Sequence, residues 1–126
     1  MDSMSPNLMV DSVRRSVEFY KSTLGFVCLK STPDGTEPDW ALMQKGDVTL
    51  MFQSRKGITS EYRELSGSRI GASATLYVMM RGLDEYYTAL KDKVQILSHP
   101  HVTAYGNKEF ALSDLNGYII VFAERM

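Results

Sequence analysis

The chain has 126 residues, 44% of them hydrophobic and 23% charged, which is ordinary for one globular domain with a sizeable core. Lys and Arg total 14 against 15 Asp and Glu, and no basic cluster interleaves with aromatic residues, so the electrostatic signature of nucleic-acid binding is missing. No apolar run approaches the roughly 18 residues of a membrane span, and no leader begins at Met1. We therefore expect a cytoplasmic protein with neither nucleic acid nor membrane as a partner.

The first part of the chain predicts one helix and four strands. Asp11 and Ser12 offer N-caps for the helix and Gly25 ends it, while the residue types of 31–38, with two prolines, predict a loop. Lys45-Gly46 between two apolar segments indicates a hairpin. The expected elements are a strand at 7–10, a helix at about 13–24, a strand at 26–30 and strands at 40–44 and 48–53.

The second part repeats this βαβββ order after a polar, glycine-bearing linker. The chain is thus interpreted as one domain, 1–126, with a first module at about 5–54, the linker at about 55–71 and a second module at about 72–126. The expected elements of the second module are a strand at 73–80, a helix at 83–93, a strand at 94–97, a loop through Pro100, and strands at 108–112 and 118–123 around a turn at 114–117.

Similar residues recur at nearly constant separation. Val10 and Val78 lie 68 apart (78 minus 10), and Phe52 and Phe122 lie 70 apart (122 minus 52). Glu18 and Glu85, in the two predicted helices, lie 67 apart (85 minus 18). This agreement indicates an internal duplication, in which each sheet packs one face on its helix and leaves the other open.

The period of two along a strand predicts which side chains share the open face. A turn at Lys45-Gly46 places Trp40 opposite Met51, and Leu42 joins them on that face. A four-residue turn at 114–117 places Phe110 opposite Val121 on the open face of the second sheet. Ser73, Thr75, Tyr77 and Met79 are expected on that face too, which makes it rich in aromatic residues and methionine.

Four segments resemble a known family. The helix segment Asp11 to Tyr20 with Leu24-Gly25-Phe26, and the later segments Tyr105 to Phe110 and Asp114 to Tyr118, are similar to the glyoxalase, bleomycin-resistance protein and extradiol dioxygenase superfamily. The resemblance extends over almost the whole chain. It implies the α+β vicinal oxygen chelate fold, two βαβββ modules whose mixed sheets form a cup, and a homodimer.

Catalytic members of that superfamily hold a divalent metal with His, Gln or Glu on the first and last strand of each module. Matching the motifs position by position places these four slots at Ser5, Met51, Ser73 and Val121. Two hydroxyls, a thioether and an isopropyl group are poor ligands for such a cation. The resemblance therefore implies a chain with no metal, no cofactor and no catalytic residues.

His99-Pro100-His101 is a separate candidate. Two histidines at i and i+2 on an extended segment can clamp a metal, with Tyr105 or Glu109 as a further donor. Pro100, however, indicates a loop or a sheet edge, and no third ligand lies at motif spacing. A surface loop and a contact of His101 with a ligand at the rim are the alternatives.

The open-face residues predict a ligand pocket with apolar walls and a few polar groups, Gln53 and Tyr105, that orient the ligand. Core packing is the competing interpretation of its aromatic members. Bleomycin itself is a doubtful ligand, because a cationic molecule favours an acidic groove. The expected ligand-binding residues are Trp40, Leu42, Met51, Gln53, Ser73, Tyr77, Met79, His101, Tyr105 and Phe110.

Our interpretation of the sequence is a metal-free protein that binds or sequesters a small, partly aromatic molecule. The first alternative is a metal-dependent lyase, isomerase or dioxygenase that uses His99, His101 and Glu124 as unorthodox ligands. The second is a degenerate module that serves only protein association.

Overall fold

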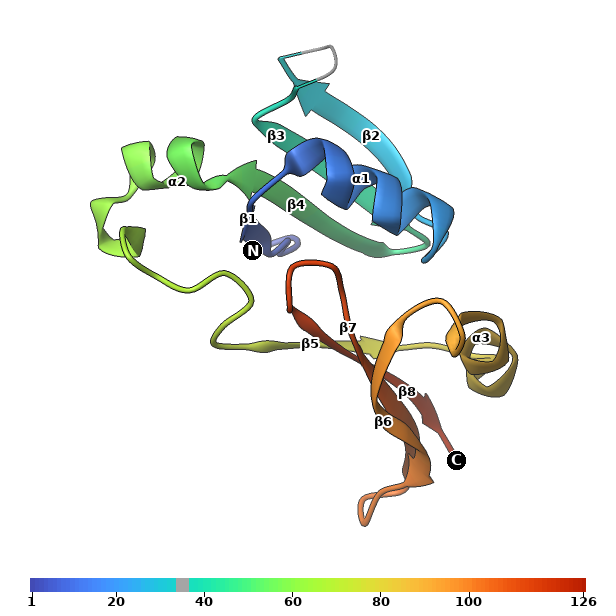
Figure 1. Cartoon of the computed structure of the whole chain (residues 1–126). Helices are drawn as coiled ribbons and strands as arrows, with labels where there is room; N and C mark the ends of the chain where they lie inside the picture. Colours follow the sequence, from blue (N-terminus) through green and yellow to red (C-terminus); the bar gives the residue numbers. More distant parts are fainter. Residues whose placement is uncertain (34–36) are drawn as a thin grey trace. The chain divides into compact units, whose positions relative to one another are not determined.

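The computed structural model of the chain describes residues 1–33 and 37–126, so part of the loop expected at 31–38 lies outside the described residues. The described residues form two compact units, Met1–Ile70 and Gly71–Met126 (Figure 1). Each unit contains one four-stranded sheet and is described by itself.

In the first unit the strand order is β1-β4-β3-β2, with β1 parallel to β4 and the other neighbours antiparallel. Ser12 caps α1, because its hydroxyl accepts a hydrogen bond of 3.1 Å from the backbone N–H of Arg15. The elements are β1 (Asn7–Val10), α1 (Val13–Ser22), β2 (Val27–Thr32), β3 (Trp40–Lys45), β4 (Val48–Ser54), α2 (Arg55–Glu61) and a 3-10 turn at Arg63–Leu65.

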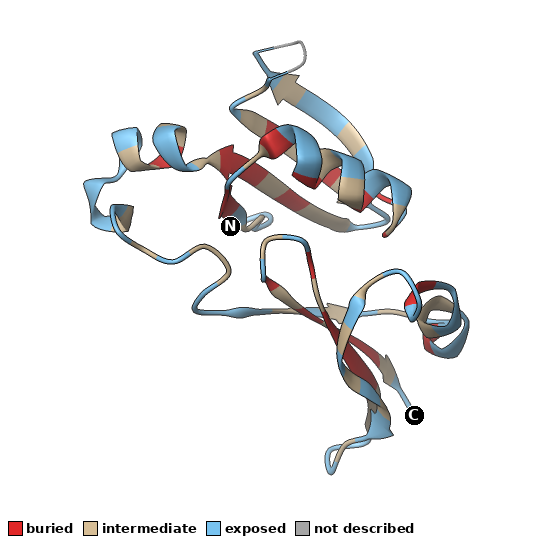
Figure 2. Ribbon diagram, viewed as in Figure 1, coloured by how far each residue is buried: buried red, intermediate tan, exposed pale blue. Residues whose placement is uncertain are grey.

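The core of the first unit lies between α1 and one face of this sheet. Tyr20 of α1 is fully buried, and its ring meets the rings of Phe26 and Phe52 edge to face at centroid distances of 5.4 and 4.8 Å. Ala41 and Met43 of β3 are also fully buried, whereas the residues between them along the strand are not (Figure 2). The odd-numbered residues of β3 therefore face the helix, and its even-numbered residues face away.

The second unit repeats the topology, with strand order β5-β8-β7-β6 and β5 parallel to β8. Its core includes the stacked rings of Phe110 and Phe122, with centroids 5.2 Å apart, and the ring of Tyr87 on α3, 5.3 Å from Phe110. The elements are β5 (Thr75–Met79), α3 (Leu83–Leu90), β6 (Gln95–Val102), β7 (Asn107–Ser113) and β8 (Ile119–Arg125). The predicted α+β class and the βαβββ order of both halves are confirmed.

Two elements differ from the prediction. The linker contains α2, which is capped by Ser54 and buries Ile58 to 5% exposure, so this segment has a folded anchor. Strand β6 continues through Pro100 to Val102, where a loop was expected. Proline is tolerated there because β6 is the edge of its sheet.

The duplication is more regular than the sequence comparison indicated. Leu8 pairs with Phe52 and Val78 with Phe122, so β1 and β5 are offset by 70 (78 minus 8), and the strands opposite them by the same 70 (122 minus 52). The helices begin at Val13 and Leu83, again 70 apart (83 minus 13). The offsets of 67 and 68 taken from similar side chains were wrong, because pairing follows backbone position and not side-chain type.

The first hairpin turns one residue later than expected. Gly46 has a φ of +58° and occupies the two-residue loop with Asp47, so Trp40 pairs with Gln53 and Leu42 with Met51. This changes the expected register by two residues. Because the side-chain period is also two, every residue of the hairpin keeps its expected face.

The second hairpin differs by one residue, and here the face does change. Asp114 bonds to Tyr118 across the turn (N to O, 2.9 Å) and Gly117 takes a φ of +91°, so the loop between the paired residues has three residues. Phe110 consequently pairs with Phe122 and is fully buried beneath α3. The expectation that Phe110 lines the open face was wrong.

None of the helices in the described part of the chain is both long enough and apolar enough to cross a membrane.

Candidate functional site

The open face of the second sheet is organised around a buried carboxylate, that of Glu109 on β7. Its side chain is only 7% exposed. Oε2 accepts a hydrogen bond of 2.7 Å from the hydroxyl of Tyr105 and another from the hydroxyl of Tyr77. The side-chain amide of Asn107 donates to the Tyr77 hydroxyl at 3.1 Å, so four side chains form one connected group.

The sheet register creates the space that this group occupies. Glu109 lies opposite Ala123 on one side and His101 on the other, and Tyr77, which pairs with Val121, reaches Glu109 diagonally across β8. Tyr105 reaches Glu109 from the turn between β6 and β7, where Gly106 has a φ of +88°. The left-handed backbone is a conformation that glycine adopts without strain.

The Glu109 carboxylate favours the protonated form of the Tyr105 hydroxyl. The hydrogen bond to Glu109 is the largest cause that raises the pKa of Tyr105 to about 12. An ionised tyrosine cannot donate, so the raised pKa extends the pH range over which the Tyr105 hydroxyl donates to Glu109. Both hydroxyls donate to Oε2, and they use none of the acceptor capacity of Oε1. A ligand group that donates hydrogen bonds fits this carboxylate.

Apolar side chains stand beside the carboxylate. Tyr77 is 47% exposed and Met79 is 48% exposed; both lie on β5, an edge strand of the second sheet. Large apolar surfaces left uncovered beside fixed polar groups are typical of ligand or protein contact surfaces.

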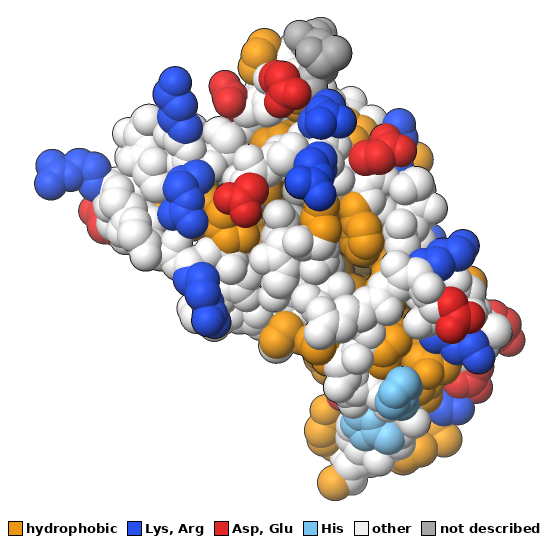
Figure 3. Space-filling model, viewed as in Figure 1, with side chains coloured by type: hydrophobic (Ala, Val, Ile, Leu, Met, Phe, Trp, Pro, Cys, Tyr) orange, Lys and Arg blue, Asp and Glu red, His pale blue; other side chains and the backbone are white. Residues whose placement is uncertain are grey.

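The two histidines lie next to one another on the surface (Figure 3). His101 Nδ1 is 2.8 Å from the backbone oxygen of His99, and His99 Nδ1 is 2.7 Å from the Tyr87 hydroxyl. Over residues 1–33 and 37–126, no group of three or more His, Cys, Asp or Glu side chains is placed to hold a metal ion. His101 lies opposite Glu109 in the register and so borders the open face.

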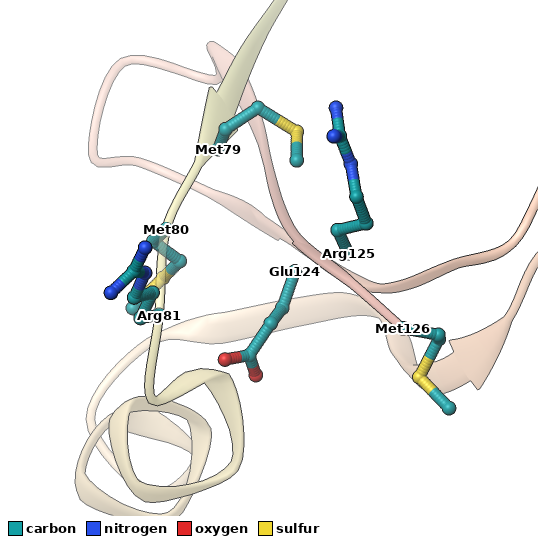
Figure 4. A pocket seen from close by; sticks show the side chains of 6 residues that line it. All are labelled: Met79, Met80, Arg81, Glu124, Arg125 and Met126. Carbon is teal, nitrogen blue, oxygen red and sulfur yellow. The ribbon is translucent and has the colours of Figure 1, made fainter.

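Glu124 has a structural role that the sequence did not indicate. Its two carboxylate oxygens accept hydrogen bonds from the backbone N–H groups of Gly82 (2.9 Å) and Leu83 (3.2 Å) at the start of α3. Figure 4 shows this carboxylate directed toward the helix, within a depression also lined by Met79 and Arg125. The idea that Glu124 serves as a metal ligand is therefore corrected to a cap of α3.

The first unit has an open cleft of about 660 Å³ on the corresponding face of its sheet. This size falls within the roughly 300–1,000 Å³ of small-molecule sites. It is lined by Asn7, Thr32, Pro33, Asp39, Trp40, Gln53, Gly57 and Glu61.

A chain of side-chain hydrogen bonds crosses this cleft. Asn7 Nδ2 donates to Gln53 Oε1 at 2.8 Å, and Gln53 Nε2 donates to Glu61 Oε1 at 2.7 Å. Gln53 is only 8% exposed, which fixes its amide, and Glu61 is the last residue of α2. Helix α2, absent from the prediction, thus supplies a carboxylate to the cleft.

The remaining predicted site residues fall in separate places. Leu42 and Met51 are neighbours in the register on the open face of the first sheet, and both are half-buried. Ser73 is exposed and precedes β5. The ten predicted residues are divided between the two units, and among them Phe110 alone belongs to a core.

The metal slots implied by the resemblance do not fit a metal. The Ser5 hydroxyl is hydrogen-bonded to that of Thr49, and Val121 offers no donor atom. With the true offset of 70, the counterpart of Ser5 is Thr75 (5 plus 70) and not Ser73. Thr75 adds only another hydroxyl, so the mismatch with carboxylate or imidazole donors remains.

Sequence reasoning missed Asn7, Glu61 and Asn107, and considered Glu109 only as a further donor for a histidine site. The sequence did contain a signal for Glu109, because the period of two along a strand places it on the opposite face from Lys108 and Phe110. The signal could be used only with the correct register of β7 on β8.

The family model described as "Glyoxalase/Bleomycin resistance protein/Dioxygenase superfamily" matches residues 5–122. Among curated proteins, none matches the sequence. Solved structures share the fold at low identity. A protein of unknown function from Agrobacterium tumefaciens str. C58 has a TM-score of 0.80 and 21% identity, over 100% of this chain and 95% of that one.

The descriptions of two further similar structures mention bleomycin. A bleomycin-binding protein complexed with bleomycin has a TM-score of 0.72 and 20% identity, with 100% of both chains covered. A bleomycin resistance determinant encoded on the transposon Tn5 has a TM-score of 0.73 and 21% identity, over 99% of this chain and 98% of that one. At these identities, the likeness shows a shared fold.

Proposed function

The chain belongs to the glyoxalase, bleomycin-resistance protein and dioxygenase superfamily, and from that premise we propose that it binds a small, partly aromatic molecule without a metal ion. One observation carries this proposal. The Glu109 carboxylate is buried and held by two tyrosine hydroxyls on a sheet face that exposes Tyr77 and Met79. A fixed acceptor beside uncovered aromatic surface suits the orientation of a small ligand.

Two similar structures support a binding function. They are described as a bleomycin-binding protein complexed with bleomycin and a bleomycin resistance determinant. Glu109 places an acidic group on an open face, where a cationic ligand can pair with it. We propose ligands of this general kind and leave bleomycin as one compound to be tested.

Absence of a metal is part of the proposal. Its support is chemical: Ser5, Met51, Thr75 and Val121 offer hydroxyl, thioether and aliphatic groups where a divalent cation needs carboxylate or imidazole. We further propose that the protein is cytoplasmic and forms a homodimer. The dimer is supported by the sheet faces opposite to those packed on α1 and α3, which a second subunit can shield.

The test is a thermal-shift screen of small aromatic compounds on the whole chain, followed by comparison of Glu109→Gln with Glu85→Gln. Glu85 is an exposed carboxylate on α3, so its variant removes the same charge outside the site. A ligand at 100 times its Kd adds about 2.7 kcal/mol of stability. We expect Glu109→Gln to lose most of this stabilisation and Glu85→Gln to retain it.

Native mass spectrometry of the purified protein supplies the second arm, because it reports subunit number, metal and carried ligand together. A stoichiometric metal ion that supports turnover would overturn the binding proposal in favour of a superfamily enzyme. A screen in which no aromatic compound raises the Tm would leave protein association as the better interpretation.

A further inference from the structure

The cleft of the first unit holds an arrangement of charge that the proposed function does not use. We infer that this cleft is a subsite for an organic cation, namely the protonated amine or quaternary ammonium group of an aromatic ligand. The inference deepens the proposed function, on which it rests, by assigning the chemical class of the ligand.

The first support is the sign of the charge. Asp39 and Glu61 line the cleft, and the described residues of its lining include no Lys or Arg. The two charged groups in the cleft are therefore both negative, in a chain whose net charge is only −1. A concave surface lined by one sign of charge raises the local concentration of the opposite ion.

The second support is the direction of the hydrogen bonds. The amides of Asn7 and Gln53 each donate toward the next group, so the chain of bonds ends on the Glu61 carboxylate. That bond uses Oε1 of Glu61 and leaves the acceptor capacity of its other oxygen for a ligand. Asp39 Oδ1 is 3.4 Å from the Ser54 hydroxyl, a long contact that consumes little of its capacity.

The third support is the indole ring of Trp40, which forms one wall of the cleft. Trp40 pairs with Gln53 and Thr32 in the register, so the ring stands in the same row as the buried amide. A cation over an indole face is attracted by the ring quadrupole, and carboxylates at the same site add Coulombic attraction. Both effects discriminate a cation from a neutral molecule of the same shape.

Three probes of one shape and different charge test the inference on the whole chain: benzylammonium, benzyl alcohol and benzoate. Trp40 is the only tryptophan, so fluorescence of the indole reports directly on the cleft. We expect benzylammonium to bind about tenfold more tightly than benzyl alcohol, and benzoate to bind more weakly than either. The preference for the cation should shrink as salt is added.

Glu61→Gln and Glu64→Gln form a matched pair of variants. Both residues are exposed, and Glu64 lies in the 3-10 turn that follows α2, outside the cleft lining. Glu61→Gln retains an oxygen that can accept from Gln53, so the fold is preserved while the charge is lost. We expect Glu61→Gln to remove most of the preference for the cation and Glu64→Gln to keep it.

The contrary results are distinct from failure of the proposed function. The cation subsite is overturned if benzylammonium and benzyl alcohol bind with equal affinity, or if Glu61→Gln and Glu64→Gln lose the preference for the cation equally. Neither result contradicts the proposal that the protein binds a small molecule. If none of the three probes changes the indole fluorescence, the cleft is not a ligand site. The proposed function is then judged by the Glu109→Gln comparison in the second unit.

Discussion

The two sheets share one backbone plan and carry different chemistry at equivalent positions. Asn7 and Tyr77 occupy the same place in β1 and β5, and Trp40 and Glu109 occupy the same place in β3 and β7, opposite Gln53 and Ala123. In the first unit the Trp40 indole thus lies opposite the Gln53 amide, and in the second unit the Glu109 carboxylate lies opposite the Ala123 methyl group. The helix-facing positions of both units are apolar, because they form the cores, whereas the open faces carry different residue types.

The sharpest way to test this division is to remove an aromatic ring from each kind of face. Phe110→Ala should cost about 3–5 kcal/mol of unfolding free energy, because it leaves a cavity between Tyr87 and Phe122. Trp40→Ala, on an open face, should cost about 1 kcal/mol or less. Urea unfolding followed by far-UV circular dichroism measures both.

If Phe110→Ala lowers the free energy of unfolding by less than about 1 kcal/mol, the register of β7 is wrong and Phe110 lies on the open face.

A smaller effect is expected where the second unit begins. Gly71 has a φ of +92°, and a Cβ added there would lie 2.8 Å from the backbone oxygen of Asn116. We expect Gly71→Ala to cost about 2–3 kcal/mol, because it combines backbone strain with a clash against main chain. Gly67→Ala is the control, since Gly67 has a similar φ of +82° but nothing within 4 Å of the added Cβ.

Both variants carry the strain of a positive φ, so the difference between their free energies of unfolding measures the cost of the clash at position 71. Equal unfolding free energies for the pair would show that the turn holding Gly117 does not contact Gly71 in solution.

The pH dependence of stability tests how Tyr86 packs on the core of the second unit. Burial raises the pKa of Tyr86 to about 12, and its ring packs on Phe122. The unfolded chain ionises this tyrosine near pH 10, so the stability present below pH 10 is lost as the pH rises toward 12. Allowing for solvent screening of a partly exposed group, we expect a loss of about 1 kcal/mol.

Chemical unfolding of the wild type and Tyr86→Phe at pH 9 and pH 11.5 measures this loss. The variant should show a smaller decline over that interval, and an identical decline would assign the effect to other groups.

The smallest expected effect concerns the contact between α2 and the first sheet. A Cβ on Gly57 would lie 3.3 Å from Gln53 Nε2 and 3.1 Å from the Ser54 hydroxyl, both tight contacts. In a helix, alanine is more stable than glycine by about 1 kcal/mol, and this gain offsets the crowding. We therefore expect Gly57→Ala to change the free energy of unfolding by about 0.5 kcal/mol or less. The side-chain amide resonances of Gln53 should shift in the NMR spectrum, and unchanged resonances would contradict the packing described.

Much of the fold followed from local patterns. The helix that starts at Val13, the strand at residues 7–10 and the repeated βαβββ order were predicted because caps, glycines and apolar periods act over a few residues. Helix α2 was missed because Thr59 and Ser60 are weak helix formers, and its anchor, Ile58, becomes evident only through burial.

The candidate site was less predictable than the fold. Tyr77 and Met79 were assigned to the open face correctly, since a strand on its own fixes the alternation of its side chains. Glu109 and Phe110 could not be assigned, because their faces depend on how the neighbouring turn closes. Asp114 accepts hydrogen bonds from the N–H groups of Asn116 and Tyr118 on one oxygen, and this geometry sets the three-residue loop.

The sequence by itself therefore determined the order of the elements, the duplicated plan and the lack of good metal donors at the superfamily slots. These depend on residue type and on short-range periodicity. The tertiary structure alone decided the register of β7 on β8, the burial of Phe110 and the meeting of Glu109 with two tyrosines. A slip of one residue costs few hydrogen bonds locally yet exchanges the two faces of a strand, so only the packed sheet selects between them.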